Sequence, residues 1–567
     1  MNVFDKQPDR RGSTSPQLFE KDRSNLFPID EFPTQVNIPA VNIWGGEDSG
    51  AVDKMATWLL PAISLQYAAD SIPPKSSPGI VASKDGLVGL LLNLIKSSGV
   101  YAIASVTIPL VSLVIAPFLT HSLSPADYGI LALLNTFIGL WAGLTQLGLA
   151  SAFFRGYSYD YSSPRDKRGV LATSTTLLFL VSILTTIGAA VMAPFIANLL
   201  FGRSSLGNLV TLAAGVVLLQ NLTIPGFSWL RAEGRALQYA LLSIGSLLIT
   251  LFATLVCVKI LHLGIAGSLI ASGGGYAAVA ICTLPIIFLR AGIELRPDIA
   301  CNLLGFGLPL VLNFFAYWVL QLVDRFLLSM YGSLIQVARY SVAYTLGSVL
   351  TVLVLAPFLL AWPTSMFAIA RRKDAVQVFQ QVFRWFSMFL LLAAFGLSLV
   401  GTIVLDLFFP VTYHSAAPII PIIAMSNVFF GVYYMFMVGA NIKRKTWLTA
   451  VFTTIAAVVN IALNLFLIPA YGAMGAAVAT LLAYIVLAFS AYIVNQKIYP
   501  IPFEIGIFCI GLLLGSAFYM TGNFLAQAQE IYIAWGIYFA FFVLYGVCLA
   551  CLGLLMMRSH KYKIQPA

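Results

Sequence analysis

Residues 390–405 read LLLAAFGLSLVGTIVL, and this uncharged stretch decides the fold class. A transmembrane strand would alternate polar and apolar residues, whereas this stretch and Leu177–Leu184 are apolar on every side. The roughly 30 Å core of a bilayer needs about 20 apolar residues per helix, and segments of that length recur from about Ser98 to Met557. The sequence therefore predicts an all-α polytopic membrane protein.

The composition of the 567-residue chain leads to the same class. Hydrophobic residues make up 59% of the chain and charged residues 10%, and the mean hydropathy is +0.90. So much apolar surface cannot be hidden inside one water-soluble globule, so lipid must serve as solvent for part of it. All six cysteines fall in or beside apolar segments, so no disulfide framework is predicted.

The lengths of the apolar segments predict about fourteen transmembrane helices. The predicted spans are 98–120, 128–150, 169–199, 207–229, 237–260, 265–289, 302–330, 340–363, 384–408, 416–440, 446–468, 473–495, 503–522 and 531–556. Residues 1–97 precede them, and residues 1–86 are polar and rich in Pro, Ser and Asp. This composition predicts a mostly disordered cytoplasmic extension.

Lysine and arginine residues are unevenly distributed over the loops between these spans. With the N-terminus in the cytoplasm, nineteen of them fall in cytoplasmic loops or in the C-terminal tail. The four that fall elsewhere after residue 97 are Arg203, Lys259, Arg325 and Arg339. This asymmetry predicts a multi-pass protein of the cell (plasma) membrane with both termini cytoplasmic. The net charge of +10 is scattered over short loops, so we expect no nucleic-acid partner.

The chain also contains an internal repeat. Gly264–Ala271 followed by Tyr276 matches Gly472–Ala479 followed by Tyr484, at a constant offset of 208 residues. Because the offset joins spans five and six to spans eleven and twelve, it predicts two six-helix lobes inserted in the same orientation. Two such lobes that rock around a cavity at the membrane midplane give alternating access without a catalytic centre.

This repeat divides the chain into four predicted parts. Residues 1–97 form the extension, residues 98–297 the N-lobe with helices 1–6, and residues 298–499 the C-lobe with helices 7–12. Residues 500–567 contain helices 13 and 14 and a basic cytoplasmic tail. Since these last two helices lie outside the repeat, we expect them to be peripheral.

Several short motifs in the two lobes resemble one transporter family. The motifs are Leu123-Ser-Pro-Ala-Asp-Tyr-Gly129, Leu147-Gly-Leu-Ala, Phe154-Arg155, Gly307-Leu-Pro-Leu, Asp324-Arg325-Phe-Leu-Leu and Arg339-Tyr340-Ser-Val-Ala-Tyr344. Over about residues 98–500 the chain resembles the polysaccharide-biosynthesis flippases, a branch of the multidrug/oligosaccharidyl-lipid/polysaccharide exporter superfamily. It departs from that pattern in having Ala338-Arg339-Tyr340 where the family has Gly-x-Tyr, and in having the extension.

The resemblance implies a transporter rather than an enzyme. Its expected cargo is a polyisoprenyl-diphosphate-linked oligosaccharide, which passes from the inner to the outer leaflet for cell-surface polysaccharide biosynthesis. Membrane lipids and the glycosyltransferases or polymerase of the same pathway are the implied partners. A cavity for this cargo would offer cations to the diphosphate, and amides, hydroxyls and aromatic faces to the sugars.

Ionisable side chains inside a span indicate candidate site residues, because each costs about 2.5–3.5 kcal/mol at the bilayer centre. In span seven, Asn313, Tyr317 and Asp324 share one helical face, with Gln321 about 40° further round. Asp324 is predicted either to serve the cavity or coupling, or to pair with a cation of a neighbouring helix. Arg325 either reaches the cavity edge or extends outward to the membrane surface.

The other candidates have structural alternatives as well. Arg339 is either a cavity charge or an interfacial anchor, and Arg155 either matches the family's arginine or only anchors the topology. Asn135 and Gln146 in span two, like Asn460 and Asn464 in span eleven, either bind ligand or join helices. Tyr340 and Tyr344 lie near a helix end, where tyrosines usually belong to the interfacial belt.

No pattern of residues indicates catalysis, a metal site or a cofactor. The sequence contains no H-E-x-x-H and no P-loop, and its four histidines are far apart, so we expect no ATP-binding domain. Two alternatives to the flippase remain. A cation-coupled multidrug antiporter of the same superfamily should place several carboxylates in its cavity, and a membrane glycan polymerase or ligase usually needs a sizeable outside loop.

Overall fold

The structure, a computed structural model, describes residues 114–233, 235–526 and 529–562, and every regular element in these residues is helical. Within these described ranges, twelve helical segments are long and apolar enough to cross a membrane. The prediction of an all-α polytopic membrane protein is therefore confirmed. The predicted N-terminal extension and most of the predicted first span lie outside the described residues.

The helices follow one another with few interruptions. In chain order they are α3 (Pro125–Thr145), α4 (Leu149–Arg155), η2 (Gly156–Asp160), α5 (Pro164–Val191), α6 (Ala193–Phe201), η3 (Ser204–Leu206), α7 (Gly207–Ala232), α8 (Ala236–Thr254), η4 (Leu255–Ile260), α9 (Gly264–Ala291), α10 (Pro297–Tyr331), α11 (Leu334–Gly347), η5 (Thr351–Leu355), α12 (Ala356–Ala370), α13 (Ala375–Phe408), η6 (Val411–Ala416), α14 (Ile419–Phe436), α15 (Val438–Ile442), α16 (Trp447–Ile498), α17 (Ile505–Ala526) and α18 (Ile531–Tyr562). The twelve long segments correspond to the second to fourteenth predicted spans, because α16 holds two of them.

Several predicted boundaries were wrong. The predicted span 169–199 is two helices, because Pro194 in the first turn of α6 begins a new helix after Met192. The predicted span 340–363 is divided between α11 and α12, with the π-helical turn η5 before α12. Helix α13 begins at Ala375 rather than at residue 384. Its first turns were missed because they are too polar for a hydropathy window to include them in a span.

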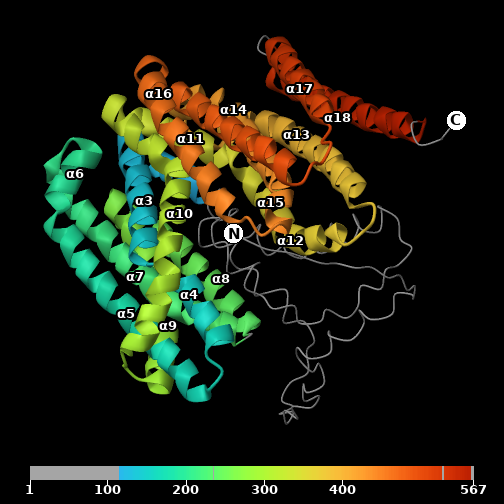
Figure 1. The fold of residues 1–567 in the computed structure, drawn as a ribbon. Helices are drawn as coiled ribbons and strands as arrows, with labels where there is room; N and C mark the ends of the chain where they lie inside the picture. The colour runs from blue at the N-terminus through green and yellow to red at the C-terminus, as the bar shows by residue number, and fades with distance from the viewer. Residues whose placement is uncertain (1–113, 234, 527–528, 563–567) are drawn as a thin grey trace, which may run out of the picture. The chain divides into compact units, whose positions relative to one another are not determined.

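We call α3 to α9 the N-terminal bundle and α10 to α16 the C-terminal bundle, after the two predicted lobes. In the first bundle α7 packs on α5 and α9, and α8 packs mainly on α9. In the second, α16 packs on α10 and α14, and α13 packs on α14. Helix α3 joins the bundles because it contacts both α10 and α11. Helices α17 and α18 lie side by side against α13 (Figure 1).

The first family motif forms the start of α3. Ser124 is the N-cap, and its hydroxyl accepts a hydrogen bond from the backbone N–H of Asp127 at 3.2 Å. Pro125 occupies the first turn, where no intrahelical N–H is required. Asp127 lies in the same turn, where a carboxylate favours the positive end of the helix dipole. Gly129 follows and faces the backbone of Leu334 at the start of α11, so the motif fixes both a helix start and a contact between bundles.

Two other motifs meet at a point where the backbones of the two bundles touch. Span two breaks between α3 and α4 at Leu147 and Gly148, both with positive φ (51° and 66°). A Cβ atom at Gly148 would lie 2.4 Å from the carbonyl oxygen of Gly307 in α10, and one at Gly307 would lie 2.3 Å from the carbonyl oxygen of Leu147. No side chain fits between them, so both positions require glycine.

We expect Gly307→Ala to destabilise the protein by about 1–3 kcal/mol, because the added methyl group would overlap a backbone oxygen that cannot rotate away. The midpoint of thermal unfolding in detergent measures this loss. Gly305→Ala is the matched control on the same helix, because no atom lies within 4 Å of a Cβ at Gly305. An equal midpoint for the Gly307 and Gly305 variants would contradict the close contact.

The sequence repeat has a counterpart in backbone conformation. Gly264 at the start of α9 has φ 56°, and Gly472 within α16 has φ 55° and ψ −132°. The two positions differ by the 208 residues of the repeat. Both mark a reversal between consecutive spans, which a residue with a Cβ adopts only under strain. A glycine with a positive φ therefore occupies the equivalent position in both halves of the repeat.

Candidate functional site

The candidate site is a buried polar cluster around Asp324 in the C-terminal bundle. The carboxylate of Asp324 on α10 is fully buried. It accepts hydrogen bonds from the hydroxyl of Tyr340 on α11 (2.6 Å), the hydroxyl of Thr480 on α16 (2.6 Å) and the amide of Asn464 on α16 (2.7 Å). The same amide of Asn464 also donates to the side-chain oxygen of Asn460 at 3.0 Å. Three helices thus converge on one carboxylate.

No side-chain cation among the described residues forms an ion pair with Asp324. Placing a charge at the bilayer centre costs about 2.5–3.5 kcal/mol on insertion scales. Hydrogen bonds to a charged group contribute about 1.5–3 kcal/mol each, so the three donors offset this cost. The cluster can therefore hold a carboxylate without a permanent counter-ion. Asp324 is also the only buried residue among the described acidic residues.

Arg325 follows Asp324 in sequence but points toward aromatic rings. Its guanidinium carbon lies 4.4 Å from the ring centre of Tyr344 and 5.7 Å from that of Tyr340. The residue is only 7% exposed. This burial does not agree with the predicted extension of Arg325 to the membrane surface. The alternative, the cavity edge, stays a prediction. Cation–π contacts hold the guanidinium inside the C-terminal bundle instead.

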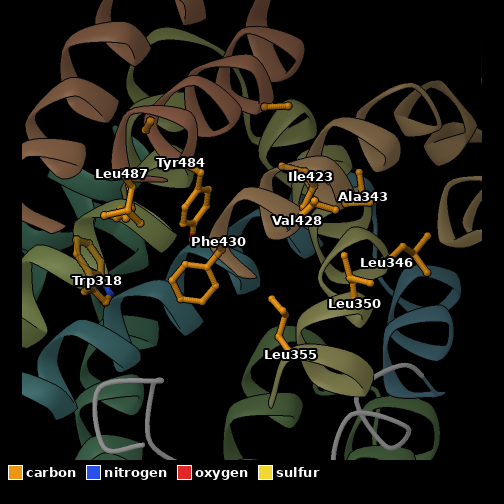
Figure 2. Close-up of a cluster of buried hydrophobic side chains, with 14 of the residues drawn as sticks. Trp318, Ala343, Leu346, Leu350, Leu355, Ile423, Val428, Phe430, Tyr484 and Leu487 are labelled. Carbon is orange, nitrogen blue, oxygen red and sulfur yellow. The ribbon is translucent and has the colours of Figure 1, made fainter. Parts of the chain in front are cut away.

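A second polar network adjoins the cluster along α10. The amide of Gln321 donates to the hydroxyl of Tyr317 at 3.1 Å and to that of Tyr484, and its oxygen accepts from Tyr344. The ring of Tyr484 also packs on Phe430, with ring centres 5.3 Å apart (Figure 2). Span seven therefore does carry a polar stripe, but in the structure its partners are side chains of the same bundle.

The remaining candidates of the C-terminal half lie apart from the cluster. The side-chain oxygen of Asn313 is buried without a hydrogen-bond partner among the described residues. Arg339 is partly exposed, and its Nε donates to the backbone oxygen of Thr412 in η6 at 3.0 Å. The structure thus brings together Asp324, Gln321 and Tyr317 with their neighbours, and places Arg339 at a loop.

Three candidates belong to the N-terminal bundle. Gln146 is buried and donates to Asn221 at 3.3 Å, within a network that also includes Thr145 and Ser182. Asn135 is exposed. The guanidinium of Arg155 lies 4.7 Å from the ring centre of Phe306 on α10 and 3.4 Å from Asp160. Arg155 therefore lies where the two bundles meet, whereas Gln146 joins helices within one bundle.

Two members of the cluster differ from the sequence-based interpretation. Tyr340 was expected in the interfacial belt, but it is fully buried and bonded to Asp324. Thr480 was not predicted as a site residue. The available signal was spacing, because Thr480 and Tyr484 lie one turn apart on the same face of α16, as Asn460 and Asn464 do.

The oxygen atoms around Asp324 determine which ligands the cluster could hold. They come from a carboxylate, hydroxyls and amides, which suit a proton or a small hard cation. The described residues contain no group of three or more His, Cys, Asp or Glu that could hold a metal ion. The chemistry available is therefore a change in the charge of one buried carboxylate.

A cavity was predicted between the two lobes with these residues on its walls. That cavity stays a prediction. The described residues also line a cavity of about 120 Å³ between α7, α8 and α9, inside the N-terminal bundle. None of the predicted site residues lines it. The reason is that Asp324 and its neighbours turn toward other helices of their own bundle.

The comparisons with known proteins agree with this architecture. Residues 118–418 match the model of a family described as "Polysaccharide biosynthesis protein". The solved lipid II flippase MurJ, in an inward closed conformation, is similar with a TM-score of 0.62 and 17% identity, covering 79% of this chain and 97% of that chain.

A second solved structure is an inward-facing multidrug resistance MATE family transporter of the MOP superfamily. It has a TM-score of 0.53 and 14% identity, covering 70% of this chain and 97% of that chain. At such identities these likenesses show a shared fold. No curated protein matches the chain by sequence.

Proposed function

Because the chain belongs to the polysaccharide biosynthesis protein family, we propose that it moves a polyisoprenyl-diphosphate-linked oligosaccharide from the inner to the outer leaflet by alternating access. The head group of such a lipid is too polar to cross hydrocarbon unaided, while its tail can stay in the bilayer. A transporter therefore has to shield only the diphosphate and the sugars.

The observation that carries the proposal is the buried carboxylate of Asp324, which has three hydrogen-bond donors and no ion-pair partner among the described residues. A site whose charge changes when it gains or loses a proton or a small cation is a means of biasing two conformations. Asp324 has direct bonds to α11 and to both halves of α16. A change in its charge would therefore alter the packing of three spans together.

Arg155 is our candidate for the first contact with the diphosphate. Its side chain is half exposed, and it lies beside Phe306 where the bundles meet. A guanidinium presents paired N–H donors that match phosphate oxygens. The charge distribution over the loops predicts that this end of α4 faces the cytoplasm, the side on which the lipid-linked cargo is assembled.

The test is a leaflet-redistribution assay with the full-length protein in liposomes. A labelled diphospho-polyisoprenyl oligosaccharide is placed in one leaflet, and its transfer is followed against protein-free liposomes. We expect transfer at least about tenfold faster with protein, since an unassisted polar head group must enter hydrocarbon. An unaltered leaflet distribution would count against the proposal, and uptake of cationic drugs in its place would favour the multidrug antiporter.

A further inference from the structure

The cavity in the N-terminal bundle has no part in the function proposed above. It lies between α7 and α8, which both pack on α9 and leave a gap between themselves. Its lining on α8 follows one helical face, from Tyr239 through Ser243, Ser246 and Leu247 to Thr250. Along α7 the lining runs from Gln220 to Arg231, about 16 Å at 1.5 Å per residue. The cavity is therefore long and narrow.

Three of the eight hydroxyl groups in its wall are bonded to backbone oxygens. Ser246 donates to Gly275 (2.8 Å), Ser272 to Ser268 (3.0 Å) and Thr223 to Gln220 (2.7 Å). The same wall includes the apolar side chains of Ile224, Phe227 and Leu247, against which hydrocarbon can pack. Half of a bilayer core measures about 15 Å, so the cavity, which begins near the α7–α8 loop, is about as long as half of that core is thick.

Positive charge gathers at the loop end of the cavity. Arg231 lines it directly. The guanidinium groups of Arg235 and Arg290 lie 5.1 Å and 5.2 Å from the ring centre of Trp229, and among the described residues neither forms an ion pair. The carboxylate of Glu233, which accepts from Tyr157, offsets only part of this charge.

The repeat gives an independent indication of the sign of the ligand. Ser272 and Tyr276, which line the cavity, occupy the positions equivalent to Thr480 and Tyr484. In the C-terminal bundle those positions surround the carboxylate of Asp324 and its amide network. None of the described acidic side chains lines the cavity of the N-terminal bundle. The two related places therefore favour ligands of opposite charge.

We propose that this cavity binds the phosphate head group of an inner-leaflet phospholipid at Arg231, with the first part of one of its chains between α7 and α8 and the rest of the lipid in the bilayer. Basic pockets between membrane helices on the cytoplasmic side suit such head groups. The cavity is smaller than the 300–1,000 Å³ common for drug-sized ligands, so it has no room for an oligosaccharide. All its helices belong to one bundle, so the lipid moves with that bundle and is not transported.

Native mass spectrometry of the detergent-solubilised full-length protein tests this site. The delipidated protein is titrated with phosphatidylglycerol. We expect one tight binding event that Arg231→Gln weakens about tenfold, the effect of losing a charge-assisted hydrogen bond. Arg231→Lys should restore part of the affinity, and Ser243→Leu should block the cavity while leaving the charge. Arg165→Gln is the matched control, because Arg165 is an exposed arginine at the predicted cytoplasmic side.

Two further titrations identify the source of the phosphate. Inorganic phosphate that competes at equal concentration would identify a free-anion site, and a polyisoprenyl diphosphate that binds more tightly than phosphatidylglycerol would identify the cargo lipid. Either result would overturn the phospholipid assignment. Unchanged phosphatidylglycerol affinity in both Arg231→Gln and Ser243→Leu would overturn the site itself.

Discussion

Asp324→Asn is expected to lower the rate of leaflet transfer about 100-fold, near the top of the range for a coupling free energy of 1–3 kcal/mol. The amide has the shape of the carboxylate and can still accept from Tyr340 and Thr480, so the bundle should fold. What it lacks is a charge that can change. The rate of transfer in liposomes, measured at equal protein content, gives the effect.

The control for this variant is Asp406→Asn. Asp406 lies near the end of α13, half exposed, with the ring of His414 at 3.4 Å. This substitution also removes one negative charge, but at a place outside the cluster. We expect the transfer rate to stay within about twofold of that of the unmodified protein, because an exposed ion pair contributes little energy. If Asp324→Asn transfers cargo at the full rate, Asp324 has a structural role only, as the alternative interpretation of span seven held.

Arg384→Leu is expected to destabilise the protein by about 3–5 kcal/mol, the cost of leaving one charge of a buried pair without its partner. The guanidinium of Arg384 on α13 is buried and bonds both oxygens of Glu504, which lies just before α17. Gln380 donates to the same carboxylate at 3.1 Å. The midpoint of thermal unfolding in detergent, together with exposure of α17 to proteolysis, measures the loss.

The matched experiment removes both charges together. In Arg384→Leu combined with Glu504→Met, no charge is left without a partner, and apolar replacements of buried pairs are often neutral. We therefore expect the double variant to regain most of the lost stability. A double variant as unstable as the single one would show that α17 is not held to α13 by this pair.

The fold class followed from the sequence because a bilayer imposes a length and a uniform polarity on each span. The stretch 390–405 could be nothing but a helix in lipid, and it lies within α13. Interruptions were harder to foresee. The breaks at Gly148 and between Met192 and Pro194 depend on the local backbone conformation and on the helices packed beside them. A hydropathy window averages over many residues and contains neither kind of information.

The site could be predicted only along a single helix. Helical spacing identified Asp324 with Tyr317 and Gln321, because residues on one helix have fixed angles to one another. It could not identify Thr480 or Tyr340, since the distance between two spans is set by packing. Arg384 shows the same limit. It is one of the nineteen cations that the sequence predicts to be cytoplasmic, and its buried ion pair with Glu504, 120 residues away, could not be read from its position in the chain.

The contact of Gly148 with Gly307 has a mechanical consequence for any rocking of the bundles. The two backbones touch without a side chain between them, so their separation at this point cannot shrink. If the bundles rotate relative to each other, we expect this contact to lie at the rotation axis. The displacement of a residue grows with its distance from that axis. The distance between two spin labels near this contact should therefore stay constant, while the distance between labels at the far helix ends changes.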